Sequence, residues 1–452
     1  MLTHLKKALA SYFDITLNRR TTFFLIMIIM AVIVIDSTVV EISSYSGLEA
    51  PPSVNITLFI ILFIGFVVVS TFLLKSVKAV LESYSYSLIS KGLRYSSTIL
   101  ITTQILTFTL ILLIILQIIL VDQYSISLLR MQTYVSHISA TIVLSFLVLM
   151  FGRWLASQKN ISIALYTISF LLIGMNLIVS LMYLKAYFSN SPVSDVSSYP
   201  IVSYVTNLVQ SSQVTDLLSR IFDVLSLSSF LILWLATAIL MKQYRRKLGK
   251  GKYYLLMGLP LIYYVYPFQS YFGDPFFPLL QSLPISFSIM YVLIFSVTKQ
   301  AGALFFSLAF LVTSSLIKDE RVRKSLLISA VGMAVLVGSL EITPLQFHVY
   351  PPYGLITEAF LPLGAYLLFV GIYFSAKNMS RDAELRREVY KRAESQLDLL
   401  RAIGVSEMEK EIVNQVKSLE SKITPPEPEP ETLSDEKVRD VIREVLEELY
   451  AK

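Results

Sequence analysis

Cysteine is absent from this 452-residue chain, and charged residues, tryptophan and histidine are scarce. The lack of cysteine excludes disulfides, thiolate metal sites, iron–sulfur clusters and cysteine nucleophiles. Charged residues make up 15% of the chain and apolar residues 55%, whereas soluble domains carry about 25% charge. A chain so poor in charge is predicted to be an integral membrane protein.

Motifs of known chemistry are also lacking. The sequence has no glycine-rich phosphate loop, no paired-histidine zinc motif, no Gly-x-Ser-x-Gly elbow and no kinase motif set. The three histidines, His4, His137 and His348, lie in separate segments. The sequence therefore predicts a non-enzymatic protein with no cofactor and no metal site.

Charge is distributed unevenly along the chain. Residues 377–452 hold 14 basic and 18 acidic residues, whereas residues 1–376 hold 24 basic and 14 acidic ones. The positive surplus lies in loops between apolar stretches, where it indicates membrane orientation rather than nucleic-acid binding. The N-terminal part is thus expected in the membrane and the C-terminal part in water.

Apolar stretches recur through the first part of the chain, and their lengths fit transmembrane helices. The predicted fold is an all-α, polytopic transmembrane helical bundle. Small residues at helical spacing, Ala330, Ala334 and Gly338 in one stretch and Gly364 and Gly371 in the last, predict close helix packing. The eleven apolar stretches are residues 21–40, 55–74, 97–121, 135–152, 161–185, 222–241, 253–270, 283–298, 301–317, 325–342 and 355–376.

The positions of lysine and arginine predict ten crossings rather than eleven, because basic residues near span ends are retained in the cytoplasm. With an even number of spans, both termini lie in the cytoplasm. The predicted location of the protein is the plasma membrane. We predict that residues 253–281, which are rich in proline and glycine, enter the membrane without crossing it. The rival interpretation is that residues 283–317 cross once, as a bent segment around Lys299.

The two ends of the chain differ from the predicted transmembrane bundle, which covers residues 21–376. Residues 1–20 have apolar side chains at helical spacing and predict an interfacial amphipathic helix. A cytoplasmic helical segment, residues 377–423, is expected to break near Gly404 and to restart at Ser406, where Glu409 completes a capping box.

Residues 424–433 alternate proline with glutamate and predict an extended spacer. Residues 434–452 predict a terminal amphipathic helix, which we expect to dock on a cytosolic protein or on the inner face of the bundle. Its docking face consists of Val438, Val441, Val445 and Leu449.

Ionisable residues within apolar stretches are costly in lipid and therefore mark candidate sites. Under the ten-span topology, five of them lie toward the outside. Two interpretations stay open: together they line an acidic outer cavity, or each touches water or a backbone amide at the interface. The five residues are Asp36, His137, Asp223, Glu341 and Glu358.

Residues 350–412 resemble the closing segment of uncharacterised polytopic membrane proteins of ammonia-oxidising archaea. The resemblance rests on Tyr-Pro-Pro-Tyr-Gly from Tyr350, Gly-Ile-Tyr-Phe-Ser-Ala from Gly371, the stretch from Asp382 to Arg386, and Ile403-Gly404 followed by Glu407-Met408-Glu409. It implies a membrane topology and a source, and it brings no activity.

Function follows from the contrast between an elaborate tail and a bundle with few charges. We expect a membrane scaffold or sensor whose tail recruits a cytosolic protein through residues 434–452, with the lipid bilayer as its other partner. The alternative is a transporter or channel for a small solute or cation that uses residues 253–281 and the acidic outer cavity. The sequence indicates no oligomeric state.

Overall fold

The computed structural model describes most of the chain. The described residues are 18–46, 51–82, 91–190, 196–198, 213–242, 249–264, 285–340, 350–382 and 398–423. Residues 1–17 of the predicted interfacial helix, Glu341, the spacer and the terminal helix therefore lie outside the described residues, as do residues 265–284.

Long helices dominate the described residues, as expected for a polytopic bundle. Seven segments are long and apolar enough to cross a membrane, and a shorter apolar one covers Gln300–Leu316. This confirms the prediction of a multi-pass helical membrane protein. The long helices are α2 (Arg19–Ser46), α3 (Pro52–Glu82), α4 (Lys91–Val121), α5 (Ile126–Ser157), α6 (Ile161–Asn190), α7 (Gln213–Met241), α12 (Ile285–Leu316), α13 (Glu320–Gly338), α15 (Leu361–Arg381) and α17 (Asp398–Ile423).

The outer helices turn apolar side chains away from the protein. In the six outer candidate spans only 33–44% of the most apolar window is buried, and the exposed remainder includes Ile61, Leu116, Leu149 and Ile168. Large apolar side chains on the outside of a bundle match the hydrocarbon of a bilayer. The lateral surface of this bundle is therefore the surface that lipid covers.

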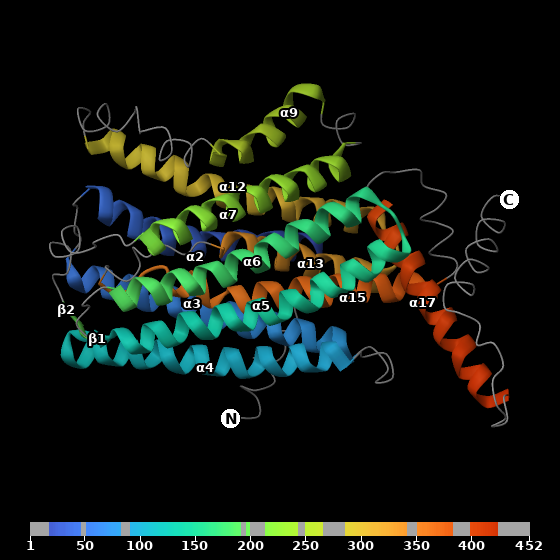
Figure 1. Ribbon diagram of the computed structural model, residues 1–452. Coiled ribbons are helices and arrows are strands. Elements are labelled where there is room, and N and C mark those ends of the chain that lie inside the picture. The colour runs from blue at the N-terminus through green and yellow to red at the C-terminus, as the bar shows by residue number, and fades with distance from the viewer. Residues whose placement is uncertain are drawn as a thin grey trace, which may run out of the picture.

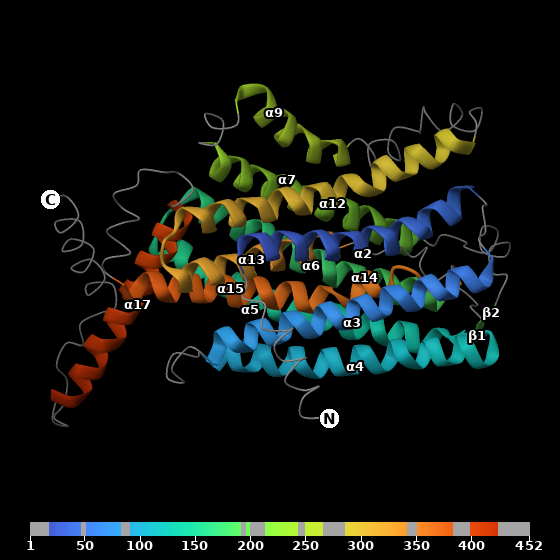
Figure 2. The ribbon, with the colours of Figure 1, turned by 180° about the vertical axis from the view of Figure 1, so that it is seen from behind.

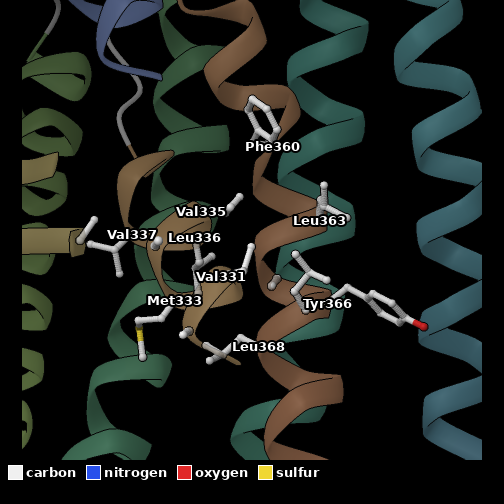
Figure 3. Packing of buried hydrophobic residues seen from close by; sticks show 14 of the residues in the cluster. Val331, Met333, Val335, Leu336, Val337, Phe360, Leu363, Tyr366 and Leu368 are labelled. Atoms are coloured by element: carbon white, nitrogen blue, oxygen red, sulfur yellow. The ribbon is translucent and has the colours of Figure 1, made fainter. Parts of the chain in front are cut away.

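The centre of the bundle is formed by α13 and α15, the last two long helices before the tail (Figures 1 and 2). Every residue from Leu355 to Ala376 is buried, and Figure 3 shows apolar side chains of the two helices packed together. Glycines bring the helices close: a Cβ at Gly332 would lie 2.3 Å from the Leu368 nitrogen, and one at Gly364 would lie 2.5 Å from the Leu336 nitrogen. The prediction that Gly364 serves helix packing is confirmed.

The two ends of the bundle carry different structures. At one end α17 lies across the ends of the helices, and at the other end two short strands, β1 (Gln123–Ser125) and β2 (Val196–Ser198), pair antiparallel (Figure 1). In the register of this pair, Tyr124 lies opposite Ser197. The pairing ties the connection after α4 to the connection after α6.

The assignment of the apolar stretches requires a correction at α12. Residues 283–298 and 301–317 were predicted as two stretches, yet Ile285–Leu316 is a single helix, as the rival interpretation has it. The polar residue Gln300 does not interrupt this helix, because it is buried and its amide Nε2 donates to Ser37 Oγ of α2 at 3.5 Å.

The segment 253–281, predicted to enter the membrane without crossing it, is described only in its first part. This part consists of helix α9 (Lys250–Gly258) and the 3₁₀ helix η2 (Leu259–Tyr264), which lie on the same side of the bundle as α7 and α12 (Figures 1 and 2). The rest of the segment lies outside the described residues, so its path stays a prediction.

The predicted break near Gly404 is wrong, because α17 runs through it without interruption. A Cβ at Gly404 would lie 2.9 Å from the Met379 Cβ of α15. Glycine therefore serves here to let α17 approach α15, not to end a helix. Ser406 and Glu409 consequently lie within the helix instead of capping a new one.

Candidate functional site

Asp36 of α2 caps a short helix in the half of the bundle opposite α17. This helix, α14 (Leu355–Ala359), begins after Gly354, whose φ of 88° is a left-handed conformation that favours glycine. Asp36 Oδ2 accepts hydrogen bonds from the backbone nitrogen and from Oγ1 of Thr357, both at 2.8 Å. A carboxylate at the N-terminus of a helix satisfies amides that have no partner within the helix.

Glu358 follows Thr357 and points to a different helix. Its Oε2 accepts a hydrogen bond from Thr133 Oγ1 of α5 at 2.7 Å. The carbonyl of Thr133 lies 2.8 Å from His137 Nδ1, and because a carbonyl can only accept, Nδ1 carries the proton. Thr133 therefore connects the carboxyl of Glu358 with the imidazole of His137.

These residues form one buried polar cluster, which we define as Asp36, Thr133, His137, Thr357 and Glu358. All five are buried, with at most 1% of their surface exposed. Three of their polar atoms, Asp36 Oδ1, Glu358 Oε1 and His137 Nε2, have no hydrogen-bond partner within the described part of the chain. Such atoms are rare in buried positions and mark a place where protons or a small polar species can be bound.

The structure brings together three of the five residues singled out from the sequence, namely Asp36, His137 and Glu358. Asp223 lies half-buried on α7 and its charge acts on Tyr183 of α6, not on the cluster. Within the described residues no group of histidine and acidic side chains could hold a metal ion. The sequence missed Thr133 and Thr357, whose hydroxyls bond the two carboxyls.

Two cavities of the described chain lie away from these residues. One of about 540 Å³ lies where α5, α15 and α17 meet, and one of about 630 Å³ lies between α4 and α5. Neither is lined by Asp36, His137 or Glu358. The three side chains are buried, and an acidic outer cavity that they line stays a prediction.

A second polar site lies at the opposite end of the bundle, where three glutamates of α17 contact α5 and α15. Glu407 lies 3.7 Å from Lys377 Nζ and 3.4 Å from Trp154 Nε1. Glu409 accepts hydrogen bonds from Ser157 and from Gln158 Nε2, the latter at 2.8 Å.

Glu411, one turn further, pairs with two basic residues of α15. Its carboxylate lies 3.1 Å from Lys377 Nζ and 3.2 Å from Arg381 Nη2. We call the contacts of Glu407, Glu409 and Glu411 the tail clasp. The clasp holds the first part of the tail against the bundle.

Acidification is expected to loosen the tail clasp. Burial alone would raise the pKa of Glu411, but the hydrogen bonds and charges of Lys377 and Arg381 outweigh it and hold the pKa below its ordinary value of 4.5. A carboxyl whose pKa is depressed in the docked state stabilises docking above its ordinary pKa, and this contribution is lost as the pH falls through the lower, docked-state value.

Spin labels can measure this release, because a chain without cysteine accepts labels at introduced cysteines alone. Lys159→Cys and Asn414→Cys place labels on exposed positions of the α5–α6 connection and of α17. The distance between them should stay constant from neutral pH down to 4.5 and lengthen below it. The same pH profile in a Glu411→Gln background would contradict the role given to Glu411.

Comparison of the chain with family models, with curated proteins and with solved structures finds no match in any of the three. The resemblance of residues 350–412 to archaeal membrane proteins therefore stays a prediction.

Proposed function

We propose that this chain is a non-enzymatic membrane sensor or scaffold in which the state of the buried polar cluster determines how firmly the tail is held. The observation that carries the proposal is that α5 contributes side chains to both sites and α15 connects them. Helix α5 supplies Thr133 and His137 at one end and Trp154 and Ser157 at the other. Helix α15 begins three residues after Glu358 and ends at the basic partners of Glu411.

The two helices are suited to transmit a displacement. α15 has 21 residues and, at 1.5 Å per residue, is about 30 Å long. It is buried along its length and packs against α5, α13 and α17. A rigid, enclosed helix that moves at one end has to move at the other.

The membrane topology is part of the proposal. Basic residues gather at the end of the bundle that carries α17, among them Arg153, Lys159, Lys377 and Arg381, and this charge favours the cytoplasmic side. If the chain between α9 and α12 crosses once, six helices before it and three after it make ten crossings. Both termini are then cytoplasmic, where the tail meets its protein partner through residues 434–452.

The test is whether a change in the buried polar cluster reaches the tail. Glu358→Gln keeps the shape of the side chain but removes its ability to ionise, and it replaces the carboxyl that accepts from Thr133 by an amide. We expect the ratio of docked to released tail, measured with labels at Lys159→Cys and Asn414→Cys, to fall about fivefold or more, which is the lower range of allosteric couplings.

Glu320→Gln provides the matched control, because Glu320 is an exposed glutamate at the tail end of α13. It should leave the label distances unchanged. Identical distance distributions in the parent and in Glu358→Gln would contradict coupling. A proton or cation flux in reconstituted vesicles that Glu358→Gln removes would favour the rival proposal, a transporter.

A further inference from the structure

The cavity of about 540 Å³ between α5, α15 and α17 has a gradient of polarity along the membrane normal. Both α5 and α15 run toward the tail end, so their later residues lie nearer the water (Figure 1). The deep part of the cavity is lined by Phe146, Leu149 and Met150 of α5 and by Phe369 of α15. This part offers apolar surface only.

The rim of the cavity is built differently. One turn further along the same two helices come Trp154 and Tyr373, whose rings are typical of the boundary between hydrocarbon and water. Arg153, next to Trp154 on α5, and Lys410 of α17 line the same part of the cavity. The aromatic and cationic groups thus lie together toward the tail end and the apolar groups lie deeper, which suits the phosphate and the acyl chains of a phospholipid.

Charge at the rim decides the kind of headgroup. Glu407 and Glu409 also line the cavity. Lys377 and Lys410 pair with Glu407, at 3.7 and 3.2 Å, and Gln158 donates a hydrogen bond to Glu409. Arg153 is exposed and forms no ion pair within the described residues. An arginine that is free to form two parallel hydrogen bonds is suited to a phosphate.

We propose that this cavity binds one anionic phospholipid, with its phosphate at Arg153 and Lys410 and an acyl chain along Phe146, Leu149 and Phe369. A soluble phosphate would not use the apolar wall, which opens on the lateral surface where Leu149 is 60% exposed. At the rim and in the tail clasp together, four basic side chains meet three carboxylates. An anionic lipid balances the surplus positive charge, whereas a zwitterionic lipid does not. The basic residues are Arg153, Lys377, Arg381 and Lys410, and the carboxylates are those of Glu407, Glu409 and Glu411.

The bound lipid has a structural consequence for the tail. Helix α17 supplies one wall of the cavity through Ser406, Glu407, Glu409 and Lys410, so a lipid seated there fills the space between α17 and the bundle. The lipid adds to the docking of the tail. This inference does not require the sensor role, because a lipid can occupy the cavity whether or not the buried polar cluster acts on the tail.

The experiment uses the full chain in nanodiscs made of equal amounts of phosphatidylglycerol and phosphatidylcholine. Lipid retained after transfer to detergent is identified by native mass spectrometry. The parent should retain one phosphatidylglycerol in preference to phosphatidylcholine. Arg153→Gln should reduce this preference about tenfold, because it removes a charge-assisted contact with the phosphate.

Lys159→Gln is the matched control, since it removes the same charge from the same end of α5 without touching the cavity. It should retain lipid like the parent. Excess inorganic phosphate or glycerol phosphate should not displace the lipid. Displacement by either probe, equal retention of both lipids by the parent, or an unchanged preference in Arg153→Gln would overturn the proposal.

Discussion

Gly332→Ala is expected to lower the free energy of unfolding by about 3 kcal/mol, the upper part of the range for overpacked cores. The added Cβ would lie 2.3 Å from the Leu368 nitrogen and 2.8 Å from the Leu367 carbonyl carbon. Both neighbours are backbone atoms of α15, so no side chain can turn aside to make room. Helices α13 and α15 would have to separate, and the contacts shown in Figure 3 would loosen along both of them.

Gly174→Ala is the control for this substitution, because a Cβ at Gly174 of α6 meets no atom within 4 Å. Thermal unfolding of the purified variants in detergent would compare the two. A large loss of stability is expected for Gly332→Ala and little or none for Gly174→Ala. Equal stability of the two variants would show that α13 and α15 do not approach as described.

Asp36→Ala is expected to destabilise the protein by about 2–4 kcal/mol, whereas Asp36→Asn should cost less. The carboxylate accepts from the Thr357 amide and hydroxyl, and each buried donor left without an acceptor costs roughly 1–3 kcal/mol. Asparagine keeps an oxygen that can accept from Thr357. Alanine removes the acceptor and leaves the N-terminus of α14 without its partner.

Asp223→Ala serves as the comparison, because Asp223 is half-buried and lies outside the buried polar cluster. Its removal should change the unfolding temperature little. If Asp36→Ala and Asp223→Ala are equally stable, Asp36 does not hold α14 in place. A folded Asp36→Asn variant would also allow the cluster to be studied without its first carboxyl.

Part of the candidate site could be found from the sequence because an ionisable side chain in an apolar stretch is conspicuous. Asp36, His137 and Glu358 stood out for this reason, and the structure places them together. Thr133 and Thr357 did not stand out, because threonine and serine are common in membrane helices and usually bond their own backbone. Thr237 does so, donating to the Leu233 carbonyl four residues earlier.

The wrong predictions about the fold have a common physical cause. Glycine at residue 404 and the polar pair Lys299-Gln300 are local signals for an interruption, and the prediction took them as such. In the structure each of these positions contacts a neighbouring helix. Met379 of α15 packs against Gly404, and Gln300 donates a hydrogen bond to Ser37 of α2. Tertiary contact overrides local preference at both places, and a single sequence does not reveal which helix will be the neighbour.

The central position of α13 and α15 has a consequence for how the protein is made. A ribosome delivers α2 to α7 first, yet in the finished bundle α2 and α3 rest against α13, while α4 and α5 rest against α15. The two helices in the middle of the bundle are thus synthesised after most of the helices that surround them. Until α13 and α15 are inserted, the earlier helices lack the two helices against which they pack. The N-terminal half of the bundle therefore has to leave room for these C-terminal helices.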